Sequence, residues 1–81
     1  MLILNAFNQE LVYDFKGETL IGADFRGLKL DEADFSSKDL TGAHFDGASL
    51  KEANFGGAIL KSVRFDGAEF AETQFFRADL E

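Results

Sequence analysis

Apolar residues fall on every fifth position over most of this chain. The positions are Phe15, Leu20, Phe25, Leu30, Phe35, Leu40, Phe45, Leu50, Phe55, Leu60, Phe65, Phe70, Phe75 and Leu80. An amphipathic helix places apolar residues three and four apart and a strand places them two apart, so neither keeps a strict period of five. A short fixed period predicts a solenoid, in which each unit leaves an apolar face that only its neighbour can cover. These side chains are therefore predicted to form the core.

Small and flexible residues keep the same phase. Alanine stands two residues before the apolar position at 23, 33, 43, 48, 53, 58, 68 and 78, and glycine stands two residues after it at 17, 22, 27, 42, 47, 57 and 67. A turn every five residues needs backbone of positive φ, which glycine adopts at little steric cost. Other residues fill the glycine slot at Glu32, Ser37, Glu52, Ser62, Glu72 and Arg77, and their turns are predicted to differ from those at glycine.

Several segments resemble the pentapeptide repeat family: Ala23-Asp24-Phe25-Arg26-Gly27, Ala33-Asp34-Phe35, Ala43-His44-Phe45-Asp46-Gly47, Ala53-Asn54-Phe55 and Ala78-Asp79-Leu80. The resemblance covers the chain from about Tyr13 to Glu81. It implies an all-β fold, a right-handed quadrilateral parallel β-helix, in which each pentapeptide forms one side of a square. With four sides to a coil, the repeats would make about three and a half coils.

Residues 1–12 do not follow the pattern, because Asn5 and Glu10 stand where the apolar residue would fall. The first coil of a solenoid exposes its core and unpaired backbone, so a terminal unit of different sequence is expected there. We predict a cap over residues 1–12 and a β-helix over residues 13–81. The apolar candidates to cover the first coil are Leu2, Leu4, Phe7, Leu11 and Val12.

Two charged residues, Glu18 and Lys38, stand in the slot that alanine fills elsewhere. Stacked coils would bring them near each other. One interpretation is a partly buried pair of opposite charges. The other is a local bulge that lets both side chains reach water, since an isolated buried charge is costly.

The apolar pattern continues to the last residues of the chain. Phe75, Phe76 and Leu80 would leave an apolar end with an open edge, which proteins normally cover or pair. One hypothesis is a tail-to-tail homodimer through the C-terminal coil. The other is that the chain is a piece of a longer protein.

The charge balance narrows the classes of partner. Asp and Glu number 15 against 8 Lys and Arg, for a formal net charge of -7. This argues against direct nucleic-acid binding, which needs clustered basic residues, and favours a basic partner or simply solubility. Cysteine is absent, so no disulfide or thiolate metal site is expected. The apolar start, Met1 to Leu4, is too short for a membrane span or a signal peptide, and we expect a cytoplasmic protein.

The wall formed by the segments around Leu30, Leu50 and Phe70 carries a candidate acidic strip, which consists of Asp31, Glu32, Glu52, Glu69 and Glu72. Glu32, Glu52 and Glu72 would form one vertical line at a spacing of about 4.8 Å. Like charges at that distance should raise the affinity of Glu52 for protons or cations. The functional hypothesis is a surface for a basic partner or a divalent ion. The alternative is that the long side chains splay into solvent.

No set of residues suggests catalysis. His44 is the only histidine and falls on an outward slot, and the serines have no base to activate them. We predict no enzyme activity, no cofactor and no metal. The predicted function is a non-enzymatic structural or protein-interaction module that presents an acidic, rod-like surface to an unidentified protein partner. The resemblance implies a second hypothesis, because some family members mimic duplex DNA and modulate type II topoisomerases such as gyrase.

Overall fold

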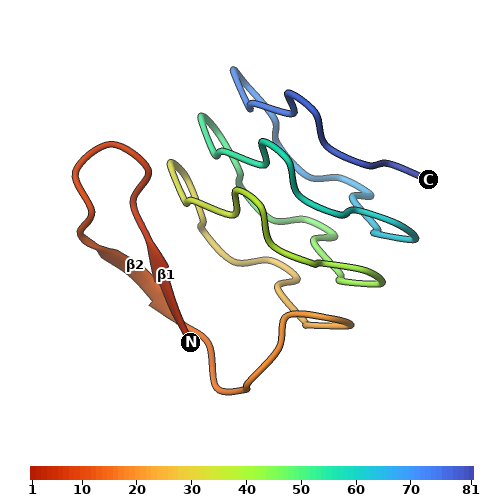
Figure 1. Ribbon diagram of the computed structural model, residues 1–81. Helices are drawn as coiled ribbons and strands as arrows, with labels where there is room; N and C mark the ends of the chain where they lie inside the picture. The colour runs from red at the N-terminus through yellow and green to blue at the C-terminus, as the bar shows by residue number, and fades with distance from the viewer.

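A computed structural model describes residues 1–81 as a stack of square coils with a hairpin at one end (Figure 1). The hairpin consists of strand β1 (Leu2–Leu4) and strand β2 (Leu11–Asp14), which pair antiparallel. From residue 20 onward a turn recurs every five residues up to the C-terminal end. The structure has no helix that could span a lipid bilayer.

Segments twenty residues apart pair in parallel through the stack. Bridges join Asp24 to His44 and His44 to Arg64, and the other walls repeat this spacing. The amide of Phe25 donates to the carbonyl of His44 at 2.8 Å. Four five-residue segments therefore bring the chain back onto itself. The absence of proline fits this arrangement, because proline could not donate a hydrogen bond along the wall.

Phenylalanine and leucine side chains fill the interior of the coils. Fully buried are Phe25, Leu30, Phe35, Leu40, Phe45, Leu50 and Phe55, and Leu20 and Leu60 are 2% exposed. Rings one coil apart stack, as Phe35 and Phe55 do with centroids 5.1 Å apart and planes at 10°. Rings on opposite walls meet edge to face, as Phe35 and Phe45 do at 5.4 Å and 81°. Both geometries are favoured for aromatic pairs beyond the area they bury.

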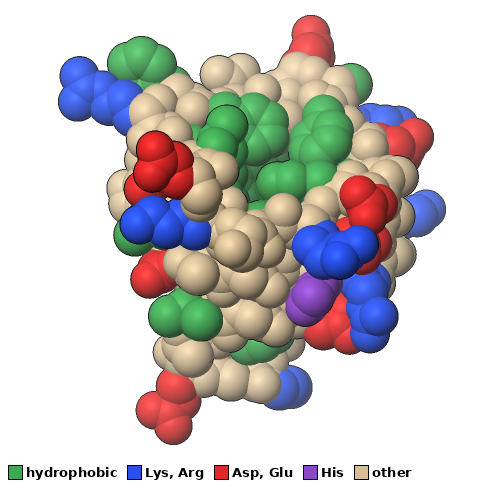
Figure 2. All heavy atoms as spheres, turned by 90° about the vertical axis from the view of Figure 1, so that its right-hand side faces the viewer, with side chains coloured by type: hydrophobic (Ala, Val, Ile, Leu, Met, Phe, Trp, Pro, Cys, Tyr) green, Lys and Arg blue, Asp and Glu red, His purple; other side chains and the backbone are tan.

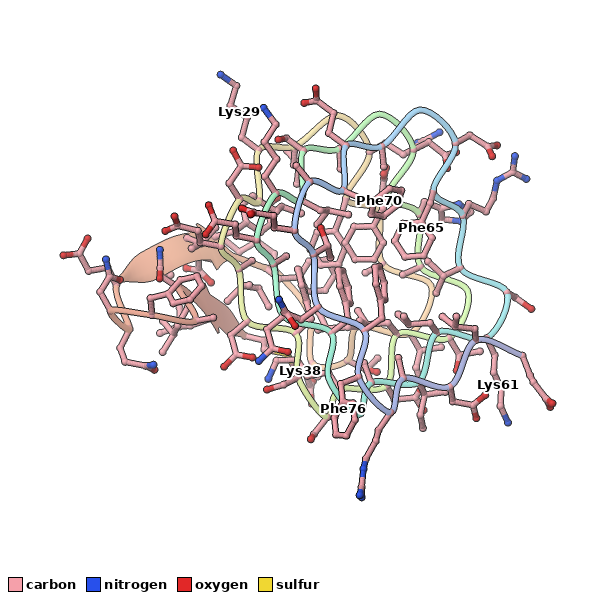
Figure 3. The ribbon with its side chains drawn as sticks, turned by 90° about the horizontal axis from the view of Figure 1, so that it is seen from above. Lys29, Lys38, Lys61, Phe65, Phe70 and Phe76 are labelled. Atoms are coloured by element: carbon pink, nitrogen blue, oxygen red, sulfur yellow. The ribbon has the colours of Figure 1, made fainter.

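The fifth-position residues of the outermost coils are less buried. Phe15, Phe65 and Phe75 are partly buried, Phe70 is 37% exposed and Leu80 is 64% exposed. The structure thus differs from the predicted core at the C-terminal end, because the last coil has no neighbour on its outer side. Figure 3 shows the rings of Phe65 and Phe70 inside the coil and that of Phe76 at its outer edge.

Every corner from Gly22 to Arg77 contains a residue of positive φ. The prediction that the non-glycine corners turn differently is wrong in this respect, since φ is 60° at Glu52 and 70° at Gly47. An L-residue in this region is strained by roughly 1–2 kcal/mol, so the surrounding coil must hold it there. Gly17 stands in the same slot before the first of these corners, but its φ is not positive. A Cβ at Gly17 would lie 2.6 Å from Cε2 of Phe15.

The hairpin covers the N-terminal end of the stack. Ile3 is fully buried in the core, and the ring of Tyr13 meets that of Phe25 at 6.1 Å. The carbonyl of Leu4 accepts a hydrogen bond from the amide of Asp34 at 2.8 Å. Side chains and backbone of the hairpin therefore both attach to the coil beneath it.

The hairpin residues that cover the first coil differ from those predicted. Val12 packs against the core, but Leu2, Phe7 and Leu11 are exposed. The prediction was wrong for these three, and it left out Ile3. Alternate residues of a strand point to opposite faces, and an apolar run does not reveal which face turns inward.

The proposed ion pair between Glu18 and Lys38 is absent. Glu18 is exposed and Lys38 is half-buried, and neither forms an ion pair. The amide of Lys38 donates to the carbonyl of Phe35 at 3.3 Å, as the alanines do in the same slot. The backbone therefore keeps its course at Lys38, and the charged groups do not pair.

Candidate functional site

The acidic strip begins beside the hairpin, where neutral groups hold its first two carboxylates. Asp31 accepts hydrogen bonds from the hydroxyl of Ser49 and from the amide of Lys51, the latter at 3.0 Å. Glu32 accepts a hydrogen bond from Nδ2 of Asn5 at 2.9 Å. These contacts tie Asp31 to the next coil and Glu32 to the hairpin.

The other three residues of the strip fall into two groups. Glu69 forms an ion pair with Lys51 at 4.0 Å, and both side chains are at least half exposed. Exposed pairs of this kind contribute about 0–1 kcal/mol. Glu52 and Glu72 form no ion pair, and the two line an open cavity of about 450 Å³ together with Phe7, Thr73 and Gln74.

The strip therefore does not act as one unit. The structure brings Glu52 and Glu72 together at the cavity beside the hairpin loop, whereas Asp31, Glu32 and Glu69 have separate partners. His44 and the carboxylates nowhere form a group of three side chains that could hold a metal ion. The arrangement therefore does not support the divalent-ion hypothesis.

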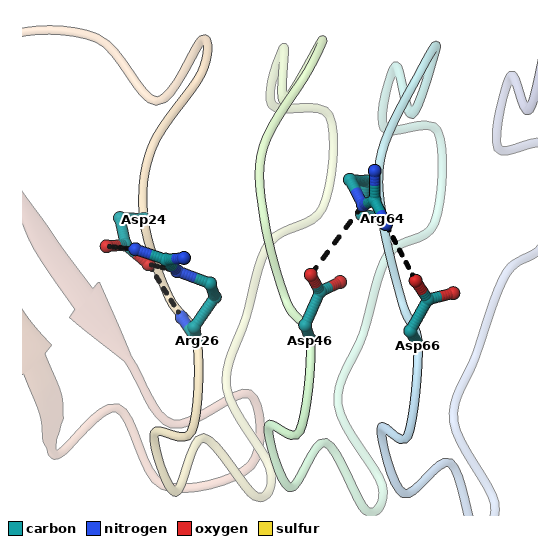
Figure 4. A network of polar contacts seen from close by, with 5 residues as sticks. All are labelled: Asp24, Arg26, Asp46, Arg64 and Asp66. Atoms are coloured by element: carbon teal, nitrogen blue, oxygen red, sulfur yellow. Dashed lines mark hydrogen bonds and ion pairs between the residues drawn. The ribbon is translucent and has the colours of Figure 1, made fainter.

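A second charged surface lies on the wall of Asp24 and Arg64 (Figure 4). The guanidinium of Arg26 donates from Nε to Oδ1 and from Nη2 to Oδ2 of Asp24, both at 2.9 Å. Arg64 reaches Asp66 at 2.8 Å and Asp46 at 3.6 Å. Positive and negative charges thus alternate on this wall, with paired groups lying in one coil or in adjacent coils.

Hydrogen bonds lower the pKa of two exposed carboxyl groups, those of Asp24 and Asp39. The side chain of Arg26 donates to Asp24 and, with the amide of Arg26, lowers the pKa of Asp24 to about 2. The same pair raises the pKa of Arg26. The hydroxyl and the amide of Thr41 donate to Asp39 and lower the pKa of Asp39. Hydrogen bonds to the charged form account for both carboxyl shifts.

Sequence reasoning missed the role of the residue just before each fifth position. The side chains of Asp24, Asp34, Asp39 and Asn54 each accept a hydrogen bond from the amide two residues further on, at 2.8–3.1 Å. Asp and Asn commonly close turns in this way. The recurrence of Asp and Asn at this position was the signal that could have revealed it, and these residues stabilise corners.

The candidate dimer end is formed by the last coil. Phe75 stacks on Phe55 at 5.3 Å, so one face of its ring is covered. Phe76 is 74% exposed, and the guanidinium of Arg77 lies 5.3 Å from its ring centroid. Figure 2 looks at this end of the molecule and shows apolar side chains gathered inside a rim of charged groups.

Comparison with known families agrees with this fold. Two family models of pentapeptide repeats match the chain, one over residues 19–57 and the other over residues 40–81. The second match alone covers more than half of the chain. The chain therefore belongs to the pentapeptide repeat family. A comparison with curated proteins gives no match.

A solved structure supports the same architecture. The chain is similar to the crystal structure of a pentapeptide repeat protein from the cyanobacterium Cyanothece 51142, with a TM-score of 0.53 and 22% sequence identity. The match covers 78% of this chain and 47% of that one, so the chain spans about half the length of this relative. The fold is that of a right-handed β-helix solenoid.

Proposed function

We propose that this chain is a non-enzymatic protein-interaction module. It forms a right-handed quadrilateral β-helix of about three and a half coils and presents its charged outer walls to a protein partner. Membership of the pentapeptide repeat family supports a repeat module of this kind. The inward side chains at every fifth position form the core, so the outward side chains remain free to contact another molecule.

The observation that carries this proposal is a surplus of carboxylates without a basic partner. Six of the 15 Asp and Glu residues take part in ion pairs. Glu52 and Glu72 are exposed, belong to no ion pair and lie together at the open cavity. Glu10 and Glu18 are also exposed and outside any ion pair, but they do not line this cavity. Surplus charge of one sign speeds encounter with a partner of the opposite sign and selects against like-charged ones. A basic protein surface therefore suits these walls best.

Charge density favours this role over mimicry of duplex DNA. B-DNA carries one negative charge per ~1.7 Å, or about 18 over the 30 Å of the longest molecular dimension. The chain has a net charge of only -7, distributed over four walls, and Arg26 and Arg64 neutralise part of one wall. We therefore expect no effect on gyrase supercoiling at micromolar protein, and inhibition or protection would favour mimicry.

The main test compares two double variants of equal charge. Immobilised Glu52→Gln/Glu72→Gln protein should lose a partner that the unchanged protein retains from cell extract, while Glu10→Gln/Glu18→Gln protein should keep it. Binding should also weaken steeply with salt, because exposed charges are screened within about 10 Å at 0.1 M. Equal retention by both variants, or retention insensitive to salt, would contradict a partner held by these walls.

A further inference from the structure

The open cavity of about 450 Å³ lies between the hairpin loop and two successive coils. Phe7, in the loop between β1 and β2, supplies the one apolar side chain of its lining, and the other four residues are polar. In Figure 3 the hairpin extends beyond the outline of the coils on one side, so the loop stands out from their outer wall. The cavity therefore opens from the side of the stack and not from either end.

Hydrogen-bond acceptors predominate in this lining. The carboxylates of Glu52 and Glu72 belong to no ion pair. Thr73 donates its hydroxyl proton to the carbonyl of Leu50 at 2.7 Å, and Gln74 directs its amide nitrogen to the carbonyl of Glu72 at 3.4 Å. A ligand that carries positive charge and offers several donors would satisfy these groups best.

The two carboxylates stand one above the other along the stack. The amide of Glu52 donates to the carbonyl of Ala71 at 2.9 Å, so the corners at Glu52 and Glu72 lie side by side, about 4.8 Å apart. Both corners have the same backbone conformation, with φ of 60° and 61°. A single cation with donors on more than one edge can reach both carboxylates at this spacing.

The protein holds its own guanidinium groups in two ways. Arg26 forms a two-pronged contact with Asp24, with both distances 2.9 Å. Arg77 lies over the ring of Phe76, with Cζ 5.3 Å from the ring centroid. Phe7 is 68% exposed and has no such cation over its ring. The cavity therefore combines the two kinds of group that hold guanidinium elsewhere on these walls, and no cation of this chain occupies it.

We propose that this cavity binds an arginine side chain of the partner protein, with the guanidinium against the ring of Phe7 and its N–H groups on Glu52 and Glu72. Guanidinium is planar and carries several donors, so it can contact a ring face and two carboxylates together, whereas the lysine ammonium acts as a point charge. This inference rests on the proposed function, because the arginine belongs to the basic partner inferred there. It adds the group that the partner must present.

Small probes test the cavity without the partner protein. N-acetylarginine amide, titrated into the unchanged protein, should shift the NMR signals of Phe7, Glu52 and Glu72 and saturate at millimolar concentration. N-acetyllysine amide has the same charge and should bind several-fold more weakly, because its ammonium is more strongly hydrated and forms no fork. N-acetylcitrulline amide is uncharged and should cause no shift at these residues. Equal affinity for the arginine and lysine probes, or shifts spread evenly over the walls, would overturn the proposal.

Single variants assign the contacts. Phe7→Leu keeps an apolar side chain without a ring and should weaken binding of the arginine probe about two- to fivefold, the size of an exposed cation–π contact. Phe76→Leu is its matched control, because Phe76 is exposed but lies outside the cavity. Glu52→Gln should also weaken binding, and Glu18→Gln should not. All four side chains are exposed, so the melting temperature should change little. Unchanged affinity of Phe7→Leu, or equal losses for the two glutamate variants, would contradict the assignment.

The probe experiment and the extract experiment can fail separately. If the arginine probe does not bind but Glu52→Gln/Glu72→Gln protein loses its extract partner, the interaction module stands and the arginine assignment is wrong. If the probe binds but the double variant keeps its partner, the cavity accepts arginine and the proposed wall partner is contradicted.

Discussion

The central and last coils of this solenoid contain the same kinds of residue in the same slots, yet they differ in burial. Leu60 is 2% exposed and Leu80 is 64% exposed, although they occupy the same slot on the same wall, twenty residues apart. Phe55 is fully buried, whereas Phe75 is only partly so. The pattern fixes which way a side chain points. The presence of a neighbouring coil decides how much of its surface leaves water.

This difference means that stability depends on contacts between adjacent coils. In solenoids, stability is roughly the sum of terms within each unit and terms between adjacent units. Residues of the last coil have one adjacent coil, and those of the central coils have two. Identical substitutions should therefore have unequal effects, and four predictions test this expectation.

The largest effect is expected for a central ring. Phe55→Ala should lower the free energy of unfolding by about 3–5 kcal/mol, because the ring is fully buried and stacks on Phe35 and Phe75. Phe75→Ala should cost clearly less, since its ring stacks on one coil only. Urea denaturation of both variants measures the difference, and equal losses would contradict dependence on neighbouring coils.

Leucine gives a second matched pair. Leu60→Ala should cost about 2–5 kcal/mol, as buried leucines do, because a cavity would form between two coils. Leu80→Ala should stay within about 0.5 kcal/mol, as expected for an exposed position. Thermal unfolding of both variants at low protein concentration checks both values. A large loss at Leu80 under these conditions would show that it is covered in solution.

The corners are expected to respond more weakly and in opposite directions. Gly47→Ala places an L-residue at a φ of 70° and should destabilise by about 1 kcal/mol. Glu52→Gly relieves the strain of an L-residue at 60° and should stabilise by up to about 1 kcal/mol. Paired urea curves measure both. A loss for Glu52→Gly would mean that contacts of the glutamate outweigh backbone strain.

The smallest effect is expected for a contact that lies within one segment. Asp24 has a pKa of about 2 in the folded protein, below about 3.9 for an unperturbed Asp. Its contribution to stability is therefore complete above about pH 4 and is lost as the pH falls through about 2. Arg26→Gln should raise the pKa of Asp24 toward the ordinary value, as carboxyl NMR titration would measure. Asp39 is the control, because its lowered pKa depends on Thr41.

The sequence predicted the interior of this protein well. Fixed spacing identified the fully buried column from Phe25 to Phe55, and the family resemblance supplied four sides to a coil. Such predictions succeed because one period governs burial, turns and hydrogen bonding together. Positive φ at Glu32, Glu52 and Glu72 was missed, since local propensity disfavours it and only the stacked coils impose it.

The ends and the polar contacts were predicted less well. The choice of Ile3 over Leu2 depends on which face of β1 turns inward, and a short apolar run does not encode that choice. The bond from Asn5 to Glu32 joins residues far apart in the chain and outside the repeat. The pairing of Asp24 with Arg26 depends on side-chain conformations, which the order of residues along a wall does not reveal. The repeat period therefore predicts structure less well where the repeat ends, and it does not predict contacts between long, exposed side chains.

The twenty-residue pairing between coils also limits how such a gene can change in length. Duplicating one central coil would add about 4.8 Å to the stack and place phenylalanine over phenylalanine and leucine over leucine. Inserting a single residue would rotate every later segment, so that charged side chains entered the interior. Length variation in descendants of this chain should therefore occur in whole coils, and tandem duplication offers a direct route to longer rods.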